Sequence, residues 1–84
     1  MTPRFAPGVR LHHDRARDRW VVMAPERMFV PDEIALEVLR LIDGARDADA
    51  IIDTLAEKFD APRDVIATDV QAMLADLRAR GAIA

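Results

Sequence analysis

The stretch Arg27-Met28-Phe29-Val30-Pro31-Asp32-Glu33 marks the point where the chain changes from strands to helices. Its first four residues form a short predicted strand, and Pro31 closes it because proline has no N–H to give to a sheet. Asp32 is a favourable helix N-cap, and Glu33 adds negative charge to the first helical turn. We therefore expect strands before residue 31 and helices after it.

Two further strands are predicted upstream. Val9–His12 alternates apolar and polar residues, the period of a half-buried strand, and Arg19–Met23 is rich in β-branched and aromatic residues. The polar residues 14–18 read as one turn, and Pro25 takes the second position of the next. Consecutive strands joined by short turns favour a three-stranded antiparallel meander.

Three helices are predicted after Pro31. The first begins at the Asp32 cap and ends at Asp43-Gly44, where glycine supplies the left-handed residue. The second, 48–59, is capped by Asp47. The third, 63–80, has Asp60 as its cap and Pro62 in its first turn, and Gly81 stops it.

Apolar residues recur at helical spacing in all three helices, and Ile83 is expected to fold back onto the last stripe. The stripes consist of Ile34, Ala35, Val38, Leu39, Leu41 and Ile42, then Ile51, Ile52, Leu55, Ala56 and Phe59, then Val65, Ile66, Val70, Met73, Leu74 and Leu77. They can cover one face of the sheet. The prediction is one α+β domain over residues 1–84, built like a winged helix-turn-helix.

Composition narrows the class of protein. The 84 residues carry 15 acids and 12 bases, for a net charge of −3, and contain no cysteine, which excludes disulfides and thiolate sites. No apolar run reaches the ~18 residues of a membrane span, and no signal-peptide core is present. We expect a soluble, cytoplasmic protein without membrane contact.

Catalytic groups are scarce. The sequence has no serine and no Gly-rich phosphate loop, and its only histidines, His12 and His13, are adjacent and would point to opposite faces of a strand. Asp49, Asp53 and Glu57 share one helix face and read as a solvated acidic ridge. We predict neither an enzyme nor a cofactor or metal site.

The distribution of charge argues against nucleic acid. Residues 1–30 carry six bases and three acids, whereas residues 31–84 carry six bases and twelve acids, and the third helix is neutral. A recognition helix needs cationic contacts to phosphates. A winged-helix module that binds DNA or a regulatory protein stays as the alternative, and a structural subunit of a larger enzyme is a second one.

Peptide recognition is the function that remains. The predicted strand 27–30 is the last of the meander, so it lies at an edge and can accept an added strand through its backbone. The same edge can pair with a second copy, or N-terminal segments can exchange. We expect a monomer in dilute solution, and a dimer can form in a crystal.

The chain resembles the PqqD family of pyrroloquinoline quinone (PQQ) biosynthesis from about Pro7 to Ile83. The matching pieces are residues 7–11, 19–26 and 32–35, Val38-Leu39, Asp43-Gly44, Ile51, Leu55, Asp69-Val70, Leu74, Leu77 and Gly81. Together, at these separations, they are specific. Pro31-Asp32 replaces a leucine–asparagine pair common in the family, and Ile42 replaces a common cysteine.

The resemblance implies a winged-helix-like recognition element for ribosomally made, modified peptides. It implies binding of the precursor peptide PqqA and its presentation to the radical S-adenosylmethionine enzyme PqqE, which makes the first Glu–Tyr crosslink. In related elements the leader adds beside the third strand, against the third helix. The corresponding residues here are Arg27, Met28, Phe29 and Val30 on the strand and Asp69, Met73, Asp76, Leu77 and Arg80 on the helix.

These residues are expected to have different roles. The strand backbone would hydrogen-bond the peptide, and Met73 and Leu77 would offer apolar contact or belong to the core. Arg27 and Arg80 would pair with peptide acids. Trp20 is interpreted as a fold determinant, or alternatively as an outer-face contact for the enzyme.

Overall fold

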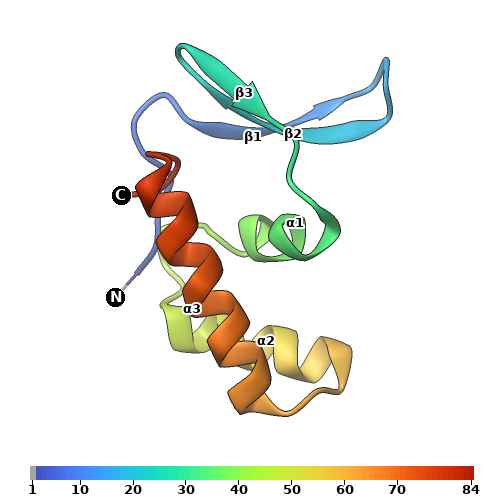
Figure 1. Ribbon diagram of the computed structural model, residues 1–84, viewed down its shortest axis with the longest axis vertical. Coiled ribbons are helices and arrows are strands. Elements are labelled where there is room, and N and C mark those ends of the chain that lie inside the picture. Colours follow the sequence, from blue (N-terminus) through green and yellow to red (C-terminus); the bar gives the residue numbers. More distant parts are fainter. Residues whose placement is uncertain (1) are drawn as a thin grey trace.

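The computed structural model describes residues 2–84 and places three strands at one end of the molecule and three helices below them (Figure 1). The elements are β1 (Arg10–Asp14), β2 (Arg19–Ala24), β3 (Arg27–Phe29), α1 (Glu33–Arg40), α2 (Ala48–Phe59) and α3 (Arg63–Ala79). The strands form one antiparallel sheet in the order β1-β2-β3. The predicted α+β meander followed by three helices is confirmed. β1 covers residues 10–14 in place of the predicted 9–12, and β3 ends at Phe29, so Val30 lies just after the strand.

The strand register separates the two faces of the sheet. Val22 lies opposite Leu11 on one side and Phe29 on the other, so these three side chains share a face. Val22 is fully buried, and Leu11 and Phe29 pack against the same core. The other buried members come from the helices, the loop after α1 and the C-terminal residues, and are Val38, Leu39, Ile42, Ile51, Ile52, Leu55, Val70, Leu74, Leu77, Ala82 and Ile83.

Trp20 lies on the inner face of the sheet, two residues from Val22. Its ring centroid is 4.8 Å from that of His13, and the Arg40 guanidinium lies 5.0 Å from the Trp20 centroid. His13 in turn contacts the Asp18 carboxylate. Trp20 therefore links the β1–β2 hairpin to the end of α1, and the alternative that it sits on the outer face is wrong.

The ends of two helices differ from the prediction. α1 stops at Arg40 with Leu41 as its C-cap, before Asp43-Gly44, because the Asp43 carboxylate accepts N–H groups from Ala45 and Arg46 and forms a separate turn. Gly44 has φ +78° within that turn. Leu41 and Ile42 thus reach the protein interior from a loop.

Asp60 does not cap α3. It ends α2 in the left-handed region, with φ 49° and ψ 47°, and its N–H bonds back to the last turn of that helix. Pro62 takes the N-cap position of α3 without any side-chain cap bond. The residue before a proline avoids helical backbone angles, which places the break between the helices at residues 60–62.

The helical stripes are wider than the surface that is buried. Ile34, Phe59 and Val65 are each more than half exposed, at 62%, 52% and 51%. Ile83 is buried and pairs with Phe5, as expected from its fold-back.

The acidic ridge of α2 is partly neutralised, because Arg63 Nε donates a hydrogen bond to Asp53 Oδ1 at 2.6 Å. This hydrogen bond raises the pKa of the Arg63 guanidinium.

Within residues 2–84, no helix is long and apolar enough to cross a membrane.

Candidate functional site

β3 lies at the edge of the sheet, and its middle residue has an open backbone. Ala24 and Arg27 face each other across the two-residue turn and form the hydrogen-bonded pair that closes the hairpin. Hydrogen-bonded and non-hydrogen-bonded pairs alternate along an antiparallel ladder, so the next pair, Met23 and Met28, is not hydrogen-bonded. The N–H and C=O of Met28 therefore point away from β2. The Met28 side chain is itself 52% exposed. The edge thus offers one donor and one acceptor to an incoming strand.

A groove lies beside this edge, between the end of β3 and the C-terminal half of α3. Phe29 and Val30 form its strand side. Its helix side consists of Met73, Asp76, Leu77 and Arg80, and the start of α1 closes it through Pro31, Asp32 and Ala35. The strand and helix residues predicted from the sequence are brought together here, with the exceptions of Met28, Arg27 and Asp69.

The groove continues along α3 toward its N-terminal half. Asp69, Ala72, Met73 and Asp76 line this second section opposite Asp32, Ile34 and Ala35. Asp69 therefore borders the same surface one section further on. Met73 is half-buried and belongs to the groove, whereas Leu77 is only 3% exposed and contributes from within the core.

Arg27 lies outside the groove, at the opposite end of β3. It lines a separate hollow with Pro7, Val9 and Gly81. A Cβ placed on Gly81 would lie 3.5 Å from an Arg27 guanidinium nitrogen. Arg27 is therefore close to the end of α3 and reaches only a peptide that extends past Met28.

Arg80 spans the groove at the Phe29 end. Its guanidinium carbon lies 5.4 Å from the centroid of the Phe29 ring, and its Nε donates to Asp76 Oδ2 at 2.9 Å. This side chain links α3 to β3 and is 52% exposed. Asp76 neutralises part of its charge.

Sequence reasoning missed the contribution of α1 to the groove. Ile34 and Ala35 line it because only residues 30–32 separate β3 from α1, so the helix begins where the strand ends. The short connection was readable from the sequence as Val30-Pro31-Asp32. That this short connection places α1 beside the groove could not be predicted, because it depends on how α1 packs against α3.

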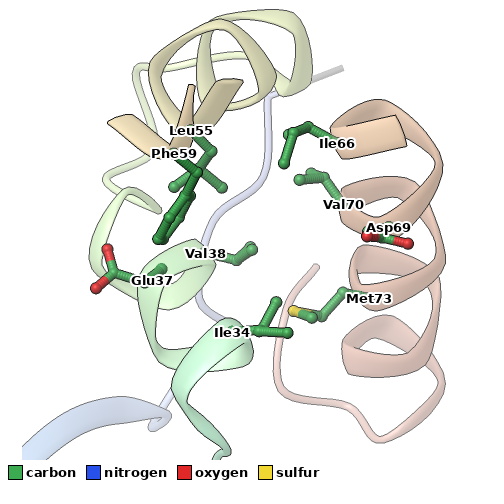
Figure 2. A pocket seen from close by; sticks show the side chains of 9 residues that line it. All are labelled: Ile34, Glu37, Val38, Leu55, Phe59, Ile66, Asp69, Val70 and Met73. Atoms are coloured by element: carbon green, nitrogen blue, oxygen red, sulfur yellow. The ribbon is translucent and has the colours of Figure 1, made fainter. Parts of the chain in front are cut away.

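An apolar pocket opens next, where α1, α2 and α3 meet (Figure 2). Its volume is about 180 Å³. Met73 borders both this pocket and the groove.

Among residues 2–84, no group of three or more His, Asp or Glu side chains could hold a metal ion. The arrangement suits an extended peptide with apolar and charged side chains.

Residues 19–83 match the family model described as Coenzyme PQQ synthesis protein D (PqqD). The chain belongs to the PqqD family. A relative in Rhodopseudomonas palustris (strain BisB5), called PqqA binding protein, is 54% identical over 79 residues, which cover 94% of this chain and 78% of the relative. The predicted family is thereby confirmed, and the relative's name describes a binding protein, in agreement with the prediction of a non-catalytic role.

Solved structures support the fold. The PqqD truncation of PqqCD from Methylobacterium extorquens, a functional and stand-alone RiPP (ribosomally synthesized and post-translationally modified peptide) recognition element, is 38% identical. The structural alignment covers 98% of this chain and 87% of that protein's chain, with a TM-score of 0.80. Lasso peptide synthetase B1, solved with its leader peptide, is only 18% identical but also has a TM-score of 0.80 over 100% of this chain and 99% of its own, which shows the same fold.

Proposed function

We propose that this chain binds the precursor peptide PqqA by strand addition to β3 and presents it to the radical S-adenosylmethionine enzyme PqqE. The single observation that carries the proposal is the open backbone of Met28 beside the groove between β3 and α3. An edge strand next to a groove can hydrogen-bond any extended peptide and select it through alternate side chains.

The relatives support a peptide ligand of this kind. Similar chains are named PqqA binding protein in Rhodopseudomonas palustris and in Gluconobacter oxydans. The lasso peptide protein of the same fold was solved in complex with a leader peptide. These descriptions concern those proteins, and they make PqqA the ligand to test first.

In this proposal, each side chain around the groove contributes one kind of contact to the peptide. Met28 hydrogen-bonds its backbone, and Phe29, Val30 and Met73 contact apolar side chains. Arg80 remains partly exposed and carries a positive charge toward an acidic residue of the peptide. Binding therefore requires an extended conformation and no chemical reaction.

Presentation to PqqE needs a surface that the bound peptide leaves free. The β1–β2 hairpin lies at the other side of the sheet and carries Arg10, Arg15 and Arg17. Arg10 and Arg15 have no ion-pair partner among the described residues, so the hairpin offers positive charge to an acidic partner. A contact of this kind weakens as salt is raised.

Titration calorimetry of the full chain with a synthetic PqqA-type precursor peptide tests the proposal. Saturable one-to-one binding at micromolar concentration or tighter supports it. Absence of binding, with and without PqqE, would contradict it while leaving the fold intact.

A further inference from the structure

The apolar pocket between the three helices is not explained by strand addition to β3. Figure 2 shows side chains from α1, α2 and α3 turned toward a common gap, among them Ile34, Phe59, Ile66 and Val70. Two of its walls are side chains that water largely reaches, since Ile34 is 62% exposed and Phe59 is 52% exposed. Large exposed apolar groups gathered around one hollow are typical of a binding surface.

The pocket is continuous with the proposed peptide groove. Met73 lines the pocket and both sections of the groove, and Ile34 and Asp69 line the pocket and the adjoining section. From Leu77 to Ile66, α3 extends about 16 Å, at about 1.5 Å per residue. An extended peptide needs about five residues to cover that length. A chain bound along β3 therefore reaches the pocket if it continues along α3.

The rim of the pocket is acidic. The carboxylates of Glu37 and Asp69 lie on opposite borders, on α1 and α3 (Figure 2). Glu37 is already bound by Lys58. Among residues 2–84, the Asp69 carboxylate has neither a hydrogen-bond nor an ion-pair partner. The rim thus attracts one positive charge, and the interior attracts an apolar group.

We propose that this pocket holds a bulky apolar side chain of the bound peptide and that Asp69 pairs with a lysine or arginine next to it. This inference rests on the proposed peptide binding. It adds a second anchor, separate from β3, and states the chemistry of the peptide that the protein selects.

The direction of β3 places this anchor along the peptide. β3 runs from Arg27, beside Gly81, toward Phe29, which faces Met73 and Asp76. A peptide paired antiparallel to β3 therefore enters along the pocket and leaves past Arg27. Antiparallel pairing is two- to threefold more common than parallel pairing. The anchoring pair is thus expected about five residues N-terminal to the residue opposite Met28.

Calorimetric titration of Ile34→Asp with the synthetic PqqA-type peptide tests the apolar part. A carboxylate at the pocket wall should weaken binding about tenfold or more, which corresponds to about 1.4 kcal/mol. Val65→Asp is the matched control, because Val65 is 51% exposed and borders none of the pockets described above. Both positions are exposed enough for the variants to fold, and circular dichroism checks this.

Asp69→Asn tests the charge. The expected loss in affinity is about 1.4- to fivefold in low salt, since an exposed ion pair contributes about 0.2–1 kcal/mol. An alanine scan of the peptide then identifies the partners. The apolar anchor of the peptide is the residue whose replacement by alanine causes no further loss of affinity for Ile34→Asp. The basic anchor is the residue whose replacement by alanine causes no further loss of affinity for Asp69→Asn.

The outcomes separate this inference from the proposed function. If the unmodified chain binds the peptide and Ile34→Asp and Asp69→Asn bind it equally well, the pocket is not an anchor, and strand addition stands alone. If Ile34→Asp weakens binding of PqqE but not of the peptide, the pocket belongs to the enzyme contact and the inference is wrong. If the unmodified chain does not bind the peptide either alone or with PqqE present, both proposals fail.

Discussion

The Arg80 guanidinium lies over the Phe29 ring at the end of the groove, with 5.4 Å between the guanidinium carbon and the ring centroid. Arg80 is the C-cap of α3 and Phe29 is the last residue of β3, so the two residues are far apart in the sequence. Asp76 holds the guanidinium in place from one turn earlier on α3. This contact joins the strand side and the helix side of the groove.

Replacing Arg80 should therefore affect binding more than stability. Arg80→Ala is expected to change the free energy of unfolding by no more than about 1 kcal/mol, because the contact is exposed. Peptide affinity should fall about three- to tenfold in calorimetry. Arg80→Lys keeps the charge but loses the planar group, so it should bind with intermediate affinity. Equal affinity for all three proteins would show that the peptide does not reach this end.

The core and the groove walls should respond differently to truncation. Ile51 is fully buried, so Ile51→Ala should lower the free energy of unfolding by about 2–5 kcal/mol. Ile34 has the same side chain and is 62% exposed, so Ile34→Ala should cost about 0.5 kcal/mol or less. Urea unfolding of both variants measures the difference. A similar cost at both positions would contradict the assignment of Ile34 to an open surface.

The turn after α1 should lose stability in acid. The N–H groups of Arg46 and Ala45 donate to the Asp43 carboxylate and hold its pKa below the ordinary value of 3.8. Because the pKa of this carboxyl group is lower in the folded state, the ionised carboxylate stabilises the fold at pH values above the pKa of the unfolded chain. This stabilisation disappears as the pH falls through the folded pKa. The stability difference between wild type and Asp43→Asn should thus shrink below about pH 4. A constant difference from pH 6 to pH 2.5 would contradict this account.

Asp60 ends α2 in a backbone conformation that favours glycine. With φ 49°, its Cβ crowds the backbone, at a cost of about 1–2 kcal/mol. Asp60→Gly relieves this crowding and should stabilise the protein by about 0.5–1 kcal/mol in thermal unfolding. The net gain is smaller than the relieved cost because glycine raises the conformational entropy of the unfolded chain. Asp60→Ala keeps the Cβ and should bring no gain. Destabilisation by glycine would indicate an unrecognised role for the Asp60 carboxylate.

Local signals predicted most of the fold. The change of period at Val30-Pro31-Asp32 separated the strands from the helices, and the Asp32 and Asp47 caps were identified correctly, since each carboxylate accepts an N–H three residues on. The errors occurred where two local signals competed. Asp60 could start one helix or end another, and Asp43-Gly44 could end a helix or form its own turn, and only the packing decides between them.

The site was predictable in part, because the edge position of residues 27–30 follows from the order of the strands. The resemblance to the PqqD family supplied the helix side. The role of Ile34 and Phe59 could not be predicted, because an apolar residue at helical spacing usually belongs to the core. Their exposure is a property of how α1, α2 and α3 meet, which no single helix encodes.

Titration of Met28→Pro with the synthetic PqqA-type peptide tests strand addition most directly. Proline removes the one N–H of β3 that points away from β2, so the sheet should remain intact while the hydrogen bond to the peptide is lost. Met28→Ala keeps the N–H and serves as the control. The account predicts unchanged circular dichroism for both variants, near wild-type affinity for Met28→Ala and no measurable binding for Met28→Pro. Wild-type affinity in Met28→Pro would contradict strand addition.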